Sequence, residues 1–276
     1  MSVPFAFADD LPFGVARFQW SHQNEADVDA GGSLQYDRWM MQAAFCKPQH
    51  LFSGLHLIPT MRYTMTHVDL SGTGLDALTD LHQLELPMTY FRKYEGTAWT
   101  LNGNVTPGFA SDFQNVDGDD FYVEARIGGD YQFTETFSLN FGLAYTRVTG
   151  DPGVIPFIGF DWKPSDDWRA SIFGPRLDVR YSLSDDFIIR LSGAPSGGLW
   201  NFQEETTKQS RFLNLVSYHV GVTLEKELCE NVWLYAGGGI SVLNHIETRD
   251  TDSNTLYEQD ADQSTFWHLG LRVGNW

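Results

Sequence analysis

The feature that most constrains this chain is a strict alternation of apolar and polar side chains through two adjacent segments, residues 121–133 and 137–146. A period of two is the period of a β-strand, because successive side chains point to opposite faces of a sheet. The apolar rows are Phe121, Val123, Ala125, Ile127, Gly129, Tyr131 and Phe133, and then Phe137, Leu139, Phe141, Leu143 and Tyr145. Only Thr134-Glu135-Thr136 separates them, so the stretch predicts a β-hairpin with a tight turn.

The length of each segment and the chemistry of its second face favour a membrane hairpin over a soluble one. A tilted strand crosses a bilayer with roughly 9 to 11 residues, and both segments are about that long. The second row of the first segment carries charge and glycine, in Glu124, Arg126, Gly128 and Asp130. The apolar row is therefore expected to face lipid, and the polar row a wet lumen.

Composition is consistent with a single barrel domain over residues 11–276. The mean hydropathy is −0.28, and no apolar run approaches the roughly 18 residues of a transmembrane helix. Half of every barrel strand is polar, so such a protein has a soluble-looking average. Ala6-Phe7-Ala8 before Asp9 has the small-x-small form of a signal-peptidase site, so we expect residues 1–10 to be a residual signal or N-terminal extension.

The same alternation extends to fourteen candidate strands and predicts an all-β fold, a closed antiparallel up-and-down transmembrane β-barrel. Besides the hairpin, the candidate strands lie near residues 11–21, 33–45, 55–66, 84–90, 99–109, 154–162, 168–173, 176–183, 187–198, 216–224, 232–242 and 267–273. The second changes phase between Tyr36 and Trp39, which suggests a bulge, and Gly193 to Gly198 suggest a bulge or inward kink.

Short and long connections alternate along the chain, which supports a membrane-spanning barrel with two different ends. Tight turns occur near residues 134–135, 164–166, 184–186 and 228–231, and aromatic residues flank them. Long polar segments are expected at 22–32, 69–80, 111–118, 204–210 and 247–263. Termini on one side require an even number of strands, and twelve is the alternative to fourteen.

Charge excludes one class of partner and suggests another. The chain has 36 acidic and 18 basic residues, a net charge of −18, which argues against nucleic acid. The acids gather in the long segments, where Asp117, Asp119 and Asp120 are weak candidates for a divalent cation. No other cofactor is expected. Such loops could also bind protein partners or bridge through cations to outer-membrane lipid, but simple solvation of the long loops is the favoured explanation.

Charged residues on the predicted inward rows form one candidate functional cluster. Strand pairing places Asp161 opposite Arg169 and Arg180 opposite Arg190, with Asp178 nearby. The arginines could line a small pore and give it a weak anion preference. Alternatively, they pair with the aspartates and plug the barrel.

Catalysis has little support in the sequence. Ser217 and His219 share the inward row of one strand, but residues two apart in a strand lie roughly 6 to 7 Å apart, so contact is not assured. No HExxH, GxSxG or CxxC motif is present, and no catalytic residue is assigned. Cys46 and Cys229 fall in turns of different hairpins, which favours two free thiols.

The chain resembles bacterial outer-membrane β-barrels over its whole length. Within PFIGFDWKPSDDWRASIFGPRLDVRYSLSDDFIIRLSGAPSGG, Pro156, Trp168 and the pair Pro175 and Tyr181 resemble a pattern in a family of uncharacterised outer-membrane barrels, a domain of unknown function. The last residue, Trp276, resembles the terminal aromatic residue read by the outer-membrane assembly machinery. The resemblance implies a bacterial outer-membrane location and assigns no activity.

Three functional hypotheses follow from these observations. The first is a porin-like passive channel for small polar solutes. The second is a plugged barrel with a structural or partner-binding role for its acidic external loops. The third is a lipid-modifying enzyme, a lipid hydrolase for example.

Overall fold

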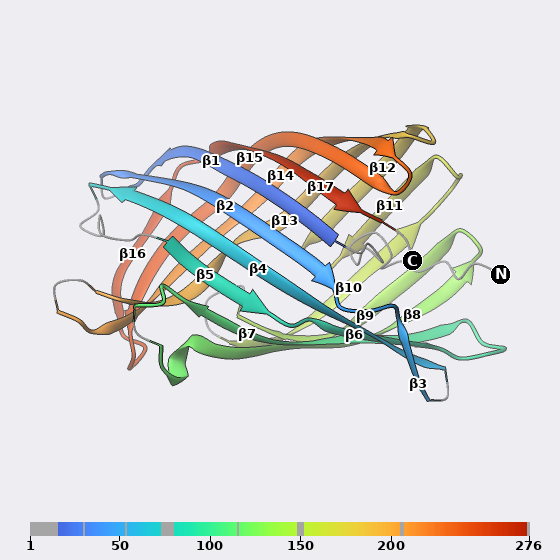
Figure 1. The fold of residues 1–276 in the computed structure, drawn as a ribbon, viewed down its shortest axis with the longest axis horizontal. Helices are drawn as coiled ribbons and strands as arrows, with labels where there is room; N and C mark the ends of the chain where they lie inside the picture. The colour runs from blue at the N-terminus through green and yellow to red at the C-terminus, as the bar shows by residue number, and fades with distance from the viewer. Residues whose placement is uncertain are drawn as a thin grey trace.

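The structure is a computed structural model that describes residues 16–29, 31–52, 54–72, 80–114, 116–147, 152–204 and 207–274. These residues form one antiparallel sheet of seventeen strands and a single 3₁₀ turn (Figure 1). The strands are β1 (Ala16–Asp27), β2 (Ser33–Ala44), β3 (Gln49–Phe52), β4 (Leu55–Ser71), β5 (Asp80–Glu85), β6 (Met88–Lys93), β7 (Trp99–Ser111), β8 (Phe121–Thr134), β9 (Phe137–Thr146), β10 (Gly153–Trp162), β11 (Trp168–Phe173), β12 (Arg176–Ser184), β13 (Phe187–Gln203), β14 (Ser210–Cys229), β15 (Val232–Asp250), β16 (Thr255–Ala261) and β17 (Ser264–Val273); the turn η1 is Gly118–Asp120. The proposed signal residues 1–10 and Trp276 lie outside the described residues.

The sheet closes on itself, which confirms the predicted barrel. β1 pairs with β2 on one side and with β17 on the other, from Ala16 opposite Val273 to Gln23 opposite Phe266. The seventeen described strands occupy fourteen positions around the ring, because β2 with β3, β5 with β6 and β16 with β17 are broken strands that share a position. The sequence predicts these fourteen positions.

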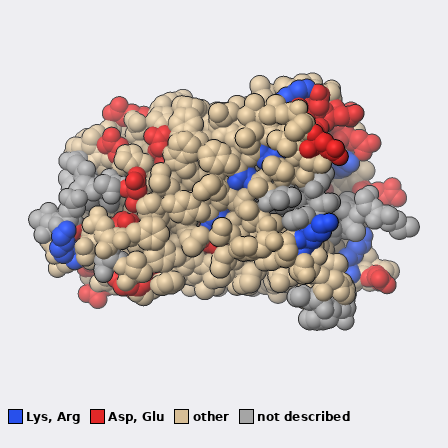
Figure 2. Space-filling view, in the orientation of Figure 1, with Lys and Arg blue, Asp and Glu red and all other residues tan. Residues whose placement is uncertain are grey.

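Inward and outward rows follow the predicted alternation. In the hairpin of β8 and β9, the outward Phe121 and Val123 are more than half exposed, whereas the inward Asp130 and Asn140 are buried. Large apolar side chains are exposed on the outer surface of most strands, as expected for a lipid-facing belt. Figure 2 shows this belt as a broad tan zone with few charges, while red and blue atoms gather toward both ends.

The two ends of the barrel differ. Tight turns such as Thr134 to Phe137 and Ser184 to Phe187 lie at the end where β1 begins and β17 finishes, which we call the inner end. Exposed Trp162 and Trp168 lie beside the β10–β11 turn at this end. No helix in the described part of the chain is long and apolar enough to cross a membrane. Cys46 and Cys229 are both free thiols.

The opposite, outer end contains more strand than the sequence predicts. β14 has 20 residues and β15 has 19, about twice what a tilted strand needs to cross a bilayer. Segment 247–263, predicted as a long loop, is mostly the end of β15 and all of β16. The predicted loop at 22–32 is wrong in its first half, because β1 continues to Asp27.

β13 leaves the wall halfway along its length. Its pairing with β12 stops at Gly193, opposite Leu177, while its pairing with β14 continues to Gln203. Beyond Gly193 the strand crosses the barrel until Asn201 pairs in parallel with Ser111 of β7. Figure 1 shows β13 and its partner β14, both in orange, approaching the green β7 at the end away from the C mark. The inward kink predicted at Gly193 to Gly198 is therefore present.

Candidate functional site: the barrel lumen

An apolar cluster closes the outer end of the lumen. Its members come from β2, β4, β5 and β7 on one side and from β13, β14 and β15 on the other, with Val28 directly after β1. They are Val28, Leu34, Tyr36, Val68, Leu70, Leu81, Ala110, Trp200, Phe202, Leu213, Leu215 and Ile246, and all are buried. We call this cluster the outer plug. Since burying one such side chain contributes roughly 1.5 to 3 kcal/mol, the plug is also a major source of stability.

The predicted bulge between Tyr36 and Trp39 is wrong, and the outer plug explains the pattern that suggested it. β2 pairs with β4 without interruption from Ser33 to Ala44, so the change of apolar phase involves no extra residue. Trp39 faces outward, whereas Tyr36 faces inward into the plug. The apolar row changes face because β2 meets lipid at one level and a dry interior at another.

Replacing Leu213 with alanine is expected to lower the free energy of unfolding by about 2 to 5 kcal/mol, because the fully buried side chain leaves a cavity in the plug. Leu191→Ala on the outward face of β13 is the control and should cost less, since lipid fills the space left by the side chain. Urea titration of the barrel folded in liposomes measures both. Equal losses would mean that the plug is not closely packed.

A polar clamp holds the inward bend of β13 against β2. Arg38 donates to the Ser196 hydroxyl at 3.1 Å and to the Gly197 carbonyl at 3.0 Å. Gly197 has a φ of +114°, and a Cβ added there would lie 1.9 Å from the Leu215 carbonyl oxygen. Glycine at this position is therefore what lets β13 turn into the lumen and reach Arg38.

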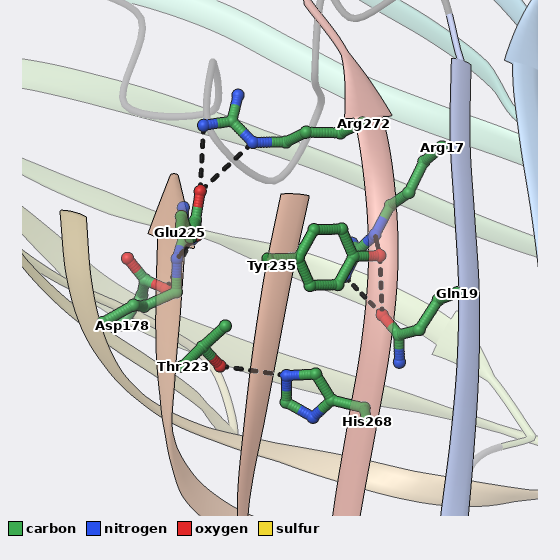
Figure 3. A network of polar contacts seen from close by, with 9 residues as sticks. Arg17, Gln19, Asp178, Thr223, Glu225, Tyr235, His268 and Arg272 are labelled. Carbon is green, nitrogen blue, oxygen red and sulfur yellow. Dashed lines mark hydrogen bonds and ion pairs between the residues drawn. The ribbon is translucent and has the colours of Figure 1, made fainter. Parts of the chain in front are cut away.

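The predicted charge cluster lies along the wall as two ion-paired groups. Arg169 and Asp161 pair at 2.8 Å, and Arg190 contacts Asp178 at 2.8 Å (Figure 3 shows Asp178). Asp161 is directly opposite Ser171, so the predicted register of Asp161 with Arg169 is wrong by two residues, although the side chains meet diagonally. Arg180 is opposite Arg190 as predicted. Arg169 and Arg190 are thus balanced by carboxylates of neighbouring strands, and these pairs connect strands along the wall.

Sequence reasoning missed the residue that links these strands. Glu225 of β14 is buried and accepts from Arg190 at 2.8 Å and from Arg272 of β17 at 2.9 Å (Figure 3). Beside it, Arg17 donates to the Tyr235 hydroxyl at 2.9 Å. Glu225 shares the inward row of Ser217 and His219, so alternation alone placed it in the lumen. What it contacts depends on strands that are distant in sequence.

A cavity of about 330 Å³ with both polar and apolar lining lies within the lumen. Its lining includes Thr60, Asn104, Arg126, Asn140, Asp161 and Ser171, from opposite sides of the ring. Arg126 lies over the ring of Phe173 at 4.5 Å, so the cavity offers both cationic and aromatic surface. Such a mixture suits a small polar or amphipathic solute.

The cavity reaches a place where the described wall is incomplete. β10 pairs with β11 only from Gly159 to Trp162, so its residues 153–158 have no described partner strand on that side. Across the gap, residues 194–199 of β13 have none on the β12 side. The tip of the β11–β12 hairpin, Gly174-Pro175, borders the same gap on the side of the inner end. We call this place the wall opening, and Ile155, Pro175 and Pro195 on its three sides all line the cavity.

The borders of the wall opening are built as strand edges. Pro156, Pro175 and Pro195 each lack an N–H, and proline within a sheet belongs where no ladder partner is present. Tyr218 reaches across Gly193 and donates to the Pro175 carbonyl at 2.6 Å. A Cβ on Gly193 would lie 3.0 Å from the Tyr218 hydroxyl oxygen, so glycine leaves room for this contact. The hairpin tip is therefore fixed in place.

Ser217 and His219 do not form a nucleophile and base pair. Both contact the hydroxyl of Tyr36, Ser217 at 3.4 Å and His219 at 3.2 Å, and the same His219 nitrogen lies 3.0 Å from the Gln23 amide oxygen. These contacts join β2, β1 and β14 just beneath the outer plug. A role in closing the lumen explains them.

The loop acids proposed for a cation are engaged in a local turn. Asp117 caps η1 by accepting from the Asp119 amide, and Asp120 accepts in return from the Asp117 amide, both at 2.9 Å. In the part of the chain that the structure describes, no group of three or more His, Cys, Asp and Glu residues could hold a metal ion. Burial raises the pKa of Asp120 above its ordinary range.

The raised pKa of Asp120 predicts a pH-dependent stability. A carboxyl whose folded pKa is raised contributes most below its ordinary value, about 3.9, and this contribution is lost as the pH rises through the folded pKa. We expect Asp120→Asn, which retains an acceptor for the Asp117 amide, to raise the thermal midpoint at pH 7 and to match the parent near pH 4. A midpoint difference that does not change with pH would contradict this.

Comparisons with known proteins agree with the barrel. The model of a domain of unknown function (DUF6268) matches residues 61–274, more than half of the chain. No curated protein sequence matches. The COG4313 outer membrane channel from Pseudomonas putida F1 is similar at a TM-score of 0.50 and 13% identity, with 99% of this chain and 100% of that chain covered.

Two further structures are more distant. They are the NanC porin, with a TM-score of 0.43, 7% identity and coverage of 94% and 100%, and a Pseudomonas aeruginosa FadL homologue, with 0.41, 9%, 93% and 87%. At these identities the similarity shows the fold alone, and the argument for the fold rests on the COG4313 outer membrane channel.

Proposed function

The chain belongs to the DUF6268 family, a domain family of unknown function, and on that premise we propose that it is a porin-like passive channel for small polar solutes in the bacterial outer membrane. The observation that carries the proposal is the cavity of about 330 Å³, lined in part by polar and charged side chains, inside a closed barrel with an apolar outer belt. The structural similarity to the COG4313 outer membrane channel supports the same function. Ion pairs along the wall give the path both signs of charge.

The test is conductance of the purified barrel in a planar bilayer, with potassium chloride as the probe. Discrete current steps are expected. Ala144→Trp, which fills the cavity, should reduce them several-fold, whereas Leu143→Trp, the adjacent residue on the lipid-facing side, should not. An absence of steps in the parent, or equal effects of the two variants, would contradict a channel through this cavity.

The second candidate is a plugged barrel with a structural or partner-binding role, and the outer plug favours it. On this reading the acidic segments at the outer end contact partners while the lumen carries no solute. Conductance separates the two proposals, because a plugged barrel gives no steps even when Ala144 and its neighbours are unchanged.

We also propose that the protein is not an enzyme. Ser217 and His219 both use the Tyr36 hydroxyl, and neither is aligned to activate the other. Incubation with labelled phospholipid, with and without calcium, should yield no product. Release of labelled fatty acid that is lost in Ser217→Ala would contradict this.

A further inference from the structure

We propose that the wall opening is an entrance from the membrane, through which a single-chain amphipathic anion, a hydrocarbon chain with an acidic headgroup, enters the lumen cavity. The inference goes beyond the proposed channel function, since it adds a second solute class and a route from the membrane into the same lumen. It rests on the edges of the opening, the surfaces beside it and the charges behind it.

The opening lies at the level of lipid. Val154 and Ile158, which point outward from the free edge of β10, are 63% and 70% exposed and apolar. Unpaired backbone groups in hydrocarbon cost several kcal/mol each, so a spanning strand normally has partners on both sides. An unpaired edge at this height is tolerated where it borders a water-filled cavity rather than lipid. Ile155 of this edge lines the lumen cavity.

The rim of the opening is apolar, whereas the cavity behind it also presents polar and charged side chains. Ile155 of β10, Phe173 of β11, and Pro175 and Pro195 on the other two sides line it, and Phe157 packs on Phe173 with ring centroids 4.5 Å apart. A hydrocarbon chain can therefore extend from the bilayer through the rim while its headgroup reaches water. A purely polar solute gains nothing from such a rim.

The charge behind the rim selects an anion. Arg176 at the hairpin tip lines the cavity, and it has no ion-pair partner among the residues that the structure describes. Arg126 lies over Phe173 in the same cavity. Two carboxylates also line the cavity, and both already have partners. Glu124 accepts from the Thr146 hydroxyl at 2.8 Å and from the Arg147 amide at 3.1 Å, and Asp161 pairs with Arg169 at 2.8 Å. A carboxylate headgroup would find a charge-assisted donor in Arg176.

The size of the cavity favours one chain over two. A volume of about 330 Å³ is at the small end of ligand sites, which span roughly 300 to 1,000 Å³. A fatty acid fits this volume better than a two-chain phospholipid, although both can present an anionic headgroup. The experiment below uses a probe for each.

The test is photo-crosslinking of laurate that carries a diazirine, with the barrel in phosphatidylcholine nanodiscs and the labelled residues mapped by mass spectrometry. We expect labelling concentrated on residues 153–158 and 194–199. Arg176→Gln should reduce it about tenfold, the loss of one hydrogen bond to a charged group. Lys163→Gln, which removes a cation in a tight turn at the inner end, should leave it unchanged. Ala144→Trp should reduce it by filling the cavity.

Several outcomes would overturn the proposal. Labelling spread evenly around the apolar belt would remove the entrance. Equal labelling by a diazirine analogue of dodecylamine would remove the selection of anions. Stronger labelling by photoactivatable phosphatidylglycerol than by laurate would replace the single-chain ligand with a phospholipid headgroup.

Conductance in potassium chloride, measured on the same preparations, separates this proposal from the channel itself. Current steps without labelling at the opening would contradict the proposed entrance but not the proposed channel. Labelling without current steps would contradict the passive channel for polar solutes but not the proposed entrance.

Discussion

Single-channel conductance should rise several-fold when Trp200 and Leu213 are both replaced by serine. These two buried side chains lie on β13 and β14 in the outer plug, at the point where the lumen is closed. Hydrophobic constrictions block ions by excluding water, and a purely apolar void of small size stays dry. Serine removes bulk and supplies hydroxyl groups, so water can enter the plug and widen the path between the cavity and the outer end.

The matched control changes the same residue types on the lipid-facing side. Trp267→Ser with Leu269→Ser alters two exposed residues of β17 and should leave the conductance of the parent unchanged. Heat-modifiable gel mobility reports whether each variant is folded before it is measured. If the plug variant is folded and its conductance equals that of the parent, the outer plug is not the barrier to axial flow.

Replacing Glu225 with glutamine should have the second large effect, on stability and on ion selectivity together. The carboxylate of Glu225 is buried between Arg190 and Arg272. Removing one partner of a buried ion pair costs roughly 3 to 5 kcal/mol because the remaining charge is uncompensated, and Asp178 lessens that cost at Arg190. Two less-balanced cations in the wall should also shift the reversal potential toward anion permeation.

Glu258→Gln is the control for this variant, since it makes the same chemical change on an exposed side chain of β16. Urea unfolding in liposomes measures stability, and the reversal potential in a potassium chloride gradient measures selectivity. Loss of stability with an unchanged reversal potential would mean that ions do not pass beside Glu225, which would exclude this part of the lumen from the conduction path.

Alternation in the sequence predicted most of the barrel because it is a local property. The inward or outward position of Asp161, Arg169 and Arg190 follows from counting along one strand. Their contacts do not follow in the same way. Arg190 meets Glu225 and Glu225 meets Arg272, and these residues are 35 and 47 positions apart in the chain. Only the order and register of the closed sheet bring them together.

The outer plug has a signal in the sequence, although the local pattern predicts a bulge in its place. Leu34, Tyr36, Val68 and Leu70 are apolar residues on inward rows, at the outer ends of β2 and β4. In an isolated strand, such residues look like a change of phase, and a bulge is the local explanation. The alternative, an apolar interior at one level of the barrel, requires a second apolar layer opposite. Trp200 and Leu213 supply that layer from more than 100 residues away.

The sequence by itself determined that the chain is a lipid-facing barrel and which side chains point inward, and it favoured fourteen positions over twelve. Each of these depends on a period of two along a strand and on the lengths of the turns. The tertiary structure decided what the inward side chains meet. The bend of β13 at Gly197, the plug it forms with β2 and β4, and the opening it leaves beside β10 arise when opposite walls come into contact. Those contacts are set by closure of the sheet, and no single strand encodes them.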